Sequence, residues 1–305
     1  MDAHHHFGTV VLLGPPNAGK STLLNKYLGQ KIAIVTPKPQ TTRNRISGIL
    51  TLPDAQVIFL DTPGIHALKG GMNRLLLQCA WSCAASADAA LVLLDGALLV
   101  RRPENLRKKQ SQLLQWLRQT RRPTFMAVNK IDLIKDKSAL LSLFERLAQI
   151  RPEAEIFPIS AKTGAGLDVL LDKVKKALPP GPALFPQDQI STLPLRFLAA
   201  EIIREKLFLG LRRELPYSVA VEIESWEENP GQGLICIHAL VYVAKNSHKA
   251  MVIGQGGKNL KRVGQEARRE IKELVGTKVF LRLWVKVRKN WTEDSSFLHT
   301  LGLGA

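Results

Sequence analysis

The sequence predicts two domains: an α/β domain built on a doubly wound, mostly parallel sheet, followed by a smaller α+β domain. Short apolar runs alternate with helical stretches over residues 9–178, which is the βαβ rhythm of a parallel sheet. A stretch rich in proline and glycine at 179–182 then interrupts any regular element. Beyond it the pattern changes to helices and strands in the order α-β-β-α-α-β.

The length and charge of the chain set limits on its class. A chain of 305 residues is about twice the usual domain length, which fits two packed domains. The formal net charge of +17 points to a polyanionic partner, either nucleic acid or an anionic membrane surface. Charge alone does not distinguish these two partners.

The number of cysteines and the lack of a long apolar run indicate a cytoplasmic protein. The three cysteines, Cys79, Cys83 and Cys236, are too few for a disulfide-stapled secreted fold and fit a reducing cytosol. Cys79 and Cys83 are four residues apart, and without further ligands at metal-binding spacing we expect buried side chains and no metal there. No run of about 18 apolar residues occurs, so we expect a cytoplasmic protein, at most peripheral to a membrane.

The first predicted strand, 10–13, leads into the segment GPPNAGKST at residues 14–22. This segment matches the phosphate-binding pattern G-x-x-x-x-G-K-S between a strand and a helix. Backbone amides would close around phosphates, Lys20 would reach the β and γ oxygens, and the Ser21 hydroxyl would bind Mg²⁺. The predicted phosphate-binding residues are Gly14, Asn17, Ala18, Gly19, Lys20, Ser21 and Thr22. A glycine turn that caps a helix is the alternative interpretation.

The next predicted strand, 57–60, ends in the sequence Asp61-Thr-Pro-Gly64. The carboxyl ends of parallel strands share one edge, so Asp61 would lie beside the phosphate-binding loop. There its carboxylate can hold Mg²⁺ through water, and the Gly64 amide can sense a γ-phosphate. D-x-x-G alone is also a common turn.

Three further strands are predicted at 90–94, 124–128 and 156–159, and the last two precede candidate base-binding residues. These residues are Asn129, Lys130 and Asp132, followed by Ser160, Ala161 and Lys162. A carboxylate at Asp132 can accept two hydrogen bonds from guanine N1–H and the exocyclic amine, which adenine does not offer. A backbone amide after Ser160 can meet guanine O6. The predicted ligands are therefore GTP and GDP.

Together these segments resemble the G1, G3, G4 and G5 boxes of the translation-factor-related GTPases. The sequence TPKPQTTRNR at 36–45 resembles the switch I region of the Era family. The resemblance implies hydrolysis of GTP to GDP and phosphate, with a switch I threonine binding Mg²⁺ beside Ser21 and Asp61. Spacing leaves Thr41 and Thr42 open, and we prefer Thr42. Lys20, Thr42 and Gly64 are the expected catalytic residues.

Two departures from better-known GTPases affect the expected chemistry. Ile65 stands where Ras-type enzymes carry a glutamine that orients water, so we expect slow unaided hydrolysis. Asn17 resembles an asparagine that binds potassium in relatives of this family, which makes K⁺ a candidate cofactor. A turn-forming asparagine is the alternative.

The second domain carries the loop Gly254-Gln255-Gly256-Gly257 between a short helix and a long one. Helix, G-x-x-G, helix is the arrangement with which KH domains clamp single-stranded RNA, and α-β-β-α-α-β is the type II KH order. Residues 245–289 contain thirteen Lys or Arg and three Glu, over half of the net charge. The predicted RNA-binding residues are Gly254, Gln255, Gly256, Gly257, Lys258, Lys261 and Arg262.

A GTPase domain (1–178), a proline-rich linker (179–194) and a type II KH domain (195–305) together resemble the architecture of the Era family. The resemblance implies binding to the 3′ end of 16S rRNA, assistance in assembling the 30S subunit and peripheral association with the inner membrane. We expect a monomer. Two alternatives stay open: a passive RNA-binding protein with a nucleotide fold as scaffold, and an ATP-using P-loop kinase.

The basic run at 101–122 belongs to none of these motifs. It holds eight basic residues and one Glu. Two interpretations are equally good. The run could contact rRNA, ribosomal protein or lipid head groups, or it could be a solvated helix and loop with Leu113, Leu114 and Leu117 facing inward.

Overall fold

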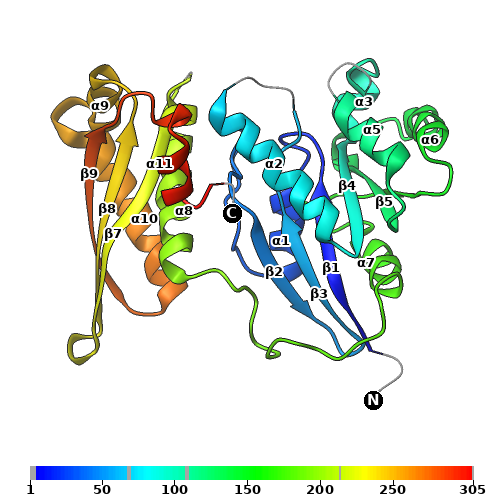
Figure 1. Cartoon of the computed structure of the whole chain (residues 1–305), viewed down its shortest axis with the longest axis horizontal. Helices are drawn as coiled ribbons and strands as arrows, with labels where there is room; N and C mark the ends of the chain where they lie inside the picture. Colours follow the sequence, from blue (N-terminus) through cyan, green and yellow to red (C-terminus); the bar gives the residue numbers. More distant parts are fainter. Residues whose placement is uncertain (1–4, 67–69, 107–109, 213, 304–305) are drawn as a thin grey trace. The chain divides into compact units, whose positions relative to one another are not determined.

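The computed structural model describes residues 5–66, 70–106, 110–212 and 214–303, which form two compact units (Figure 1). The first comprises Met1–Ala33, Thr42–Lys69 and Asn73–Thr192. The second comprises Ile34–Thr41, Gly70–Met72 and Leu193–Ala305. One sheet lies in each unit, mostly parallel in the first and mixed in the second, which confirms the predicted fold class.

The first unit is built on a six-stranded sheet in the order β2-β3-β1-β4-β5-β6. Its strands are β1 (His6–Leu13), β2 (Ile46–Thr51), β3 (Ala55–Asp61), β4 (Ala89–Asp95), β5 (Thr124–Asn129) and β6 (Glu155–Pro158). All neighbouring strands are parallel except β2, which runs antiparallel to β3. β2 was not predicted because Ser47 and Gly48 interrupt its apolar run. A Cβ at Gly48 would collide with the Leu24 side chain.

Helices cover both faces of this sheet. They are α1 (Lys20–Leu28), α2 (Gly71–Ser86), α3 (Gly96–Arg101), α5 (Ser111–Gln119), α6 (Ala139–Ile150) and α7 (Leu167–Lys176). One face packs α2, α5 and α6 against Val11 and Leu13 of β1, with Cys79 and Cys83 buried in that core. The intervening β1 residues Val10 and Leu12 are also fully buried, as expected for a strand covered on both faces.

The proline-rich segment lies along the first unit. The Gly181 amide donates to the His5 carbonyl oxygen, and the Gln56 amide oxygen accepts from the Leu184 amide at 2.8 Å. Further on, the Ile49 amide of β2 donates to the Ile190 carbonyl at 2.8 Å. The segment therefore satisfies the otherwise open edge of β2 without forming a regular strand.

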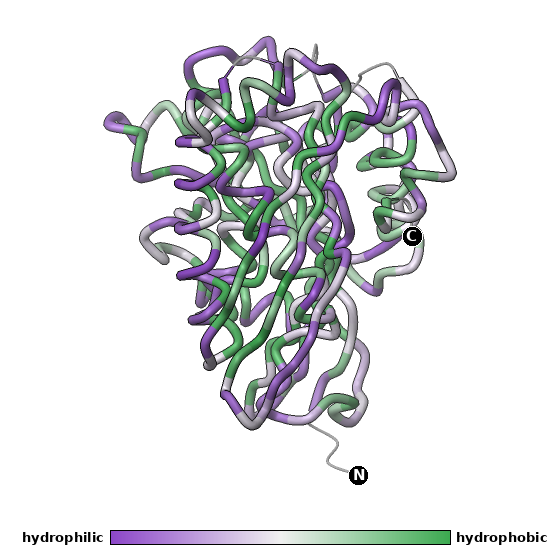
Figure 2. The backbone as a smooth tube through the Cα atoms, turned by 90° about the vertical axis from the view of Figure 1, so that its left-hand side faces the viewer, coloured by the Kyte–Doolittle hydropathy of each residue, from purple (hydrophilic) through white to green (hydrophobic). Residues whose placement is uncertain are grey.

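In the second unit a three-stranded sheet packs against three helices. The elements are α8 (Leu195–Gly210), β7 (Val219–Asn229), β8 (Leu234–Val243), α9 (Asn246–Ile253), α10 (Lys258–Val275), β9 (Lys278–Val287) and α11 (Ser295–Thr300). β7 and β8 are antiparallel, and β9 joins β8 in parallel as an edge strand. Val263, Ala267 and Ile271 place the apolar stripe of α10 in the core. In Figure 2 hydrophobic segments gather in the strands of the sheets.

Several details were not anticipated. The short α11 escaped sequence analysis because six residues are too few for a helical period to stand out. Leu113, Leu114 and Leu117 of the basic run are buried, whereas Arg107, Lys108 and Lys109 lie outside the described residues. Among the described helices, none has the length and apolar character needed to cross a membrane.

Candidate functional site

The predicted phosphate-binding loop joins β1 to the N-terminus of α1. Gly19 precedes the helix at a φ of 100°, and a Cβ there would collide with Nδ2 of the Asn129 side chain. Lys20 is buried, and its ammonium group donates to the carbonyl oxygens of Gly14 (3.3 Å) and Pro15 (3.2 Å). The first turn of α1 contains Ser21 and Thr22 but no acidic residue, so its amides and Lys20 are arranged for an anion.

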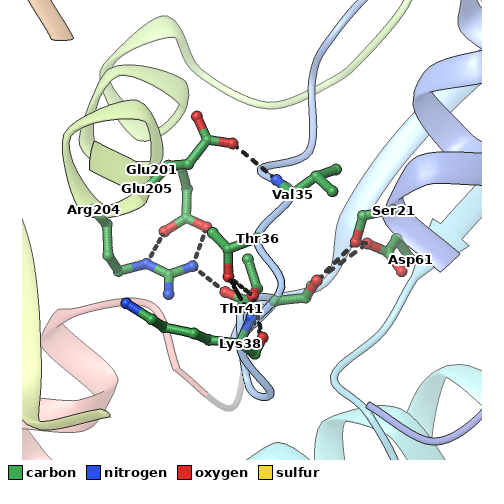
Figure 3. A network of polar contacts seen from close by, with 10 residues as sticks. Ser21, Val35, Thr36, Lys38, Thr41, Asp61, Glu201, Arg204 and Glu205 are labelled. Carbon is green, nitrogen blue, oxygen red and sulfur yellow. Dashed lines mark hydrogen bonds and ion pairs between the residues drawn. The ribbon is translucent and has the colours of Figure 1, made fainter. Parts of the chain in front are cut away.

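Three oxygen-bearing side chains meet beside this loop, as Figure 3 shows for Ser21 and Asp61. The Ser21 hydroxyl donates to Asp61 Oδ2 at 2.6 Å, and Thr42 Oγ1 donates to the same oxygen at 3.3 Å. The two hydroxyl oxygens are 2.9 Å apart. Thr41 points elsewhere, because its hydroxyl is bonded to Thr36 and to the Lys38 carbonyl. Of the two threonines, only Thr42 thus lies with Ser21 and Asp61.

The Asp61 carboxylate has the properties expected of a cation ligand. It is fully buried, and its Oδ1 has no hydrogen-bond partner among the described residues. Burial raises the pKa of Asp61, while the Lys20 ammonium and the two hydroxyls oppose that shift. Burial in turn lowers the pKa of Lys20. Mg²⁺ prefers oxygen ligands, and this site offers two hydroxyl oxygens and a buried carboxylate with one unpaired oxygen.

The segment after Asp61 closes over the phosphate-binding loop. The Ile65 amide donates to the Gly14 carbonyl at 3.0 Å, and Ile65 itself is buried. A Cβ at Gly64 would lie 2.7 Å from the backbone nitrogen of Pro16. Glycine is therefore required at residue 64 by close backbone approach, and the buried Ile65 offers no group to orient water.

One amide side chain joins the three loops of the predicted base pocket. Asn129 Nδ2 donates to the Ala18 carbonyl at 2.8 Å, and its Oδ1 accepts from the Ala161 amide at 2.9 Å. Asp132 is exposed, and its Oδ1 accepts from the Ser160 hydroxyl at 2.7 Å. The structure thus brings the predicted residues of the two loops together, with Lys162 exposed at the end of the second.

Asp95, at the end of β4, is a site residue that was not predicted. Its carboxylate pairs with the Lys130 ammonium at 2.6 Å and also caps α3 by accepting from the Leu98 amide. Lys130 itself adopts a left-handed backbone with φ 68°, which is uncommon for a residue other than glycine. An acidic residue directly after a buried strand was the available signal.

The segment predicted as switch I, residues 36–45, is divided between the two units. Residues Ile34–Thr41 belong to the second unit, where they pack on α8 (Figure 3). Glu205 accepts from the Val35 amide at 2.9 Å, and Lys38 donates to the carbonyls of Phe208 and Leu211. Arg204 donates to the Thr41 carbonyl oxygen and pairs with Glu201. The next residue, Thr42, is counted in the first unit.

We expect Arg204→Ala to lower the free energy of unfolding of the second unit by about 3–5 kcal/mol, because it leaves the buried Glu201 charge unpaired. Hydrogen exchange of the β8 amides in the intact chain measures this. Lys173→Ala, which breaks the half-exposed pair with Glu155, is the control and should cost less than about 1 kcal/mol at the β5 amides. Equal losses in the two variants would contradict the prediction. Arg204→Met with Glu201→Leu should recover most of the stability.

The G-x-x-G loop of the second unit has open space beside part of its backbone. Gly254, Gly256 and Gly257 have φ values of 73°, 58° and 74°. A Cβ at Gly254 would collide with Asn259, but one at Gly256 or Gly257 would meet nothing within 4 Å. The last two glycines thus leave their backbone accessible from outside. Gln255 and Lys258 are exposed beside them.

A groove of about 400 Å³ runs from this loop between α10 and β9. It is lined by Gly257, Leu260, Lys261, Gly264, Gln265, Arg268, Leu281, Arg282 and Leu283. Lys261, which was predicted to bind RNA, lines this groove. The guanidinium of Arg262, also predicted, forms an ion pair with Glu266 at 3.1 Å and donates a hydrogen bond to Asn259. Arg268 and Arg282 were missed because their place in the groove depends on how α10 meets β9.

The parallel sheet, the Walker-type loop and the base-pocket loops define a P-loop GTPase joined to a KH domain. A family model described as "50S ribosome-binding GTPase" matches residues 9–130, and one described as "KH domain" matches residues 214–292. The chain belongs to the GTPase Era family. It is 57% identical to GTPase Era of Nitratidesulfovibrio vulgaris strain Miyazaki F, over 98% of this chain and 97% of that protein.

Other relatives agree. GTPase Era of Geobacter metallireducens is 45% identical over 97% of each chain. A crystal structure of Era in complex with MgGDPNP and nucleotides 1506–1542 of 16S ribosomal RNA has a TM-score of 0.93 at 37% identity, covering 99% of this chain and 100% of that one. A variant of Aquifex aeolicus Era bound to GDP and AlF₄⁻ has a TM-score of 0.89, also at 37% identity, covering 98% of this chain and 100% of that one. The predicted family, the GTPase activity and the use of guanine nucleotide with Mg²⁺ are confirmed.

Proposed function

We propose that this chain is a GTP-hydrolysing switch that binds the 3′ region of 16S rRNA and assists assembly of the small ribosomal subunit. The observation that carries the proposal is the meeting of the Ser21 and Thr42 hydroxyls on the buried Asp61 carboxylate, beside Lys20. An open G-x-x-G loop lies in the same chain. The related Era structure that holds MgGDPNP and 16S nucleotides supports the combination.

In the nucleotide site each residue has a distinct role. Ser21, Thr42 and Asp61 would hold Mg²⁺, which would supply positive charge against the charge that develops on the phosphates. Lys20 and the amides of the phosphate-binding loop hold the phosphates, and the Gly64 amide contacts the γ-phosphate. Asp132 reads guanine, while Asn129 and Lys130 hold the pocket together. The loop at 160–162 meets the O6 edge of the base.

The RNA site is proposed at Gly254, Gln255, Gly256, Gly257, Lys258, Lys261 and Arg262. We assign 1–178 to the GTPase domain, 179–194 to the linker and 195–305 to the KH domain. We further propose that the chain acts as a monomer on the 30S precursor, with peripheral association at the inner membrane. Its net charge of +17 suits both anionic surfaces.

Binding titrations separate this proposal from its alternatives. GTP, GDP and ATP are each titrated onto the chain, followed by the 16S 3′-terminal RNA and a scrambled RNA. The proposal predicts tight GTP and GDP binding, negligible ATP binding and preference for the terminal RNA. A passive RNA-binding protein would bind no nucleotide, and a P-loop kinase would bind ATP. Either result would refute the proposal.

Potassium dependence is expected to reside at Asn17. This residue has a left-handed backbone with φ 61°, which suits a turn-forming asparagine and leaves the role of K⁺ as a prediction. If Asn17 helps to hold K⁺, GTP turnover should be faster in KCl than in NaCl of equal ionic strength, and Asn17→Gly should abolish that difference. Glycine preserves the left-handed turn, so a loss of turnover in both salts would point to a role of the Asn17 side chain other than holding K⁺. Equal parental rates in both salts would exclude potassium as a cofactor.

A further inference from the structure

The Asn25 side chain holds the stretch of chain that precedes the predicted switch I. Its Oδ1 accepts hydrogen bonds from the backbone amides of Ile32 and Ala33, both at 3.0 Å, and its Nδ2 donates to the Ala33 carbonyl at 2.7 Å. One amide side chain thus satisfies three backbone groups of a segment that belongs to neither α1 nor β2. Ile32 and Ala33 are buried, which leaves these backbone groups little water to bind.

Ala33 is the residue at which the chain leaves the first unit. The first unit resumes at Thr42, and Ile34–Thr41 between them belong to the second unit. Ala33 and Thr42 are therefore the two ends of a loop of eight residues. At the far end, the Thr42 hydroxyl oxygen lies 2.9 Å from that of Ser21. At the near end, Asn25 holds the last residue before the loop.

The helix α1 carries the partners of both ends of this loop. Ser21 and Asn25 are four residues apart on α1, so they lie on one face of the helix, a single turn apart. A helix keeps that spacing fixed. The place where the loop begins and the place that Thr42 must reach are therefore set by the same rigid element.

Fixing Ala33 shortens the stretch of chain that must be ordered before Thr42 can join Ser21. With Asn25 in place, only residues 34–41 lie between the two fixed points. Without it, the fixed point upstream is the end of α1, and the loop comprises residues 29–41. A longer loop has more conformations, and closing it costs more entropy. The buried Ile32 side chain keeps part of the attachment, so the loss of Asn25 should loosen the loop rather than release it.

A purely structural role for Asn25 has different consequences. If Asn25 served only to stabilise α1, its loss would disturb Lys20 and Ser21, which begin the same helix. Nucleotide affinity and hydrolysis would then fall together. An anchor for the loop affects hydrolysis alone, because the phosphate-binding loop and Asp132 hold the nucleotide from other segments of the chain.

We propose that Asn25 is a positioning residue for GTP hydrolysis, which anchors the start of the predicted switch I so that Thr42 reaches Ser21 and Asp61. It acts through Thr42 and not on the nucleotide. This inference rests on the proposed role of Thr42 in the nucleotide site and deepens it, because it names the side chain that brings this threonine into place.

The rate of hydrolysis and the affinity for GDP separate positioning from a structural role. Asn25→Ala should lower the single-turnover rate of GTP hydrolysis about tenfold, because Thr42 reaches its partners less often, and leave GDP affinity within about twofold of the parent. Asn25→Asp keeps an acceptor for both backbone amides and should retain most of the rate. Thermal unfolding of each variant confirms that it is folded at the assay temperature.

Gln56 offers a matched control in the same unit. Its Oε1 accepts from the backbone amides of Leu184 and Phe185 at 2.8 and 2.9 Å, and its Nε2 donates to the Phe185 carbonyl at 2.8 Å. The pattern of three backbone hydrogen bonds is the same, but it holds the proline-rich segment against the start of β3. Gln56→Ala should therefore leave the rate of hydrolysis and the affinity for GDP unchanged.

Combining Asn25→Ala with Thr42→Ala tests whether Asn25 acts through Thr42. Thr42→Ala should lower the rate, and adding Asn25→Ala should cause no further loss. Losses that multiply in the double variant, a parental rate for Asn25→Ala, or a GDP affinity that falls with the rate would each overturn the positioning role and leave the proposed function in place. A parental rate for Thr42→Ala would instead overturn the proposed role of Thr42, and this inference with it.

Discussion

Asp132→Asn should reduce the affinity for GTP by about 10⁴-fold and raise the affinity for xanthosine triphosphate, because the substitution replaces a hydrogen-bond acceptor with a donor at the base. The side chain is held in place by the Ser160 hydroxyl, so the amide would present its donor where guanine presents N1–H and an amine. Xanthine carries an oxygen in place of that amine and would accept the new hydrogen bond. Fluorescence titration with labelled GTP and XTP measures both changes.

Asp136→Asn is the matched control. Asp136 is also exposed, and its carboxylate accepts from the Ser138 amide and hydroxyl four residues beyond the candidate base contact. The same chemical change there should leave both nucleotides unaffected. An Asp132→Asn chain that kept the parental affinity for GTP would show that this carboxylate does not read the base. Loss of GTP and XTP alike would indicate damage to the pocket.

The double substitution Gly256→Asp with Gly257→Asp should weaken binding of the 16S 3′-terminal RNA on the order of 100-fold, since two carboxylates would face phosphates with like charge. The structure has open space around both positions, so the added side chains would not collide with the fold. Aspartate also tolerates the left-handed backbone better than most residues. GTP binding, which resides in the first unit, should be retained.

A matched pair of glycines separates this effect from general loss of charge. Gly276 and Gly302 have φ values of 70° and 74°, with open space around a Cβ, and lie in the same unit. Gly276→Asp with Gly302→Asp therefore adds the same charge and the same backbone strain away from the loop. If general basicity supplied all the affinity, the two double variants would lose equal affinity across a salt series. A clamp at the loop predicts that the control pair loses little.

Local motifs explain why much of the nucleotide site was accessible from sequence. Residues 14–22 form a contiguous loop whose chemistry depends on neighbours in the chain, and Asp61 and Asn129 each follow a buried strand. Parallel strands gather their carboxyl ends at one edge, so these predictions required only the order of the strands. The periodicity of α10 likewise identified its buried stripe.

The remaining features depend on contacts between distant parts of the chain. Arg204 meets Thr41 across 163 residues, so the assignment of most of switch I to the second unit had no local signal. Thr42 could be separated from Thr41 only by the side chains that each one contacts.

In the function proposed here, one chain couples a guanine-nucleotide switch to an RNA clamp. The rate of GTP turnover tests this coupling directly. It is measured for the parent chain and for the Gly256→Asp, Gly257→Asp chain, each with the 16S 3′-terminal RNA or a scrambled RNA. We predict equal, slow basal turnover in both chains, with stimulation only in the parent and only by the terminal RNA. Turnover of the parent that the terminal RNA leaves unchanged, or equal stimulation of the double variant, would contradict the coupling.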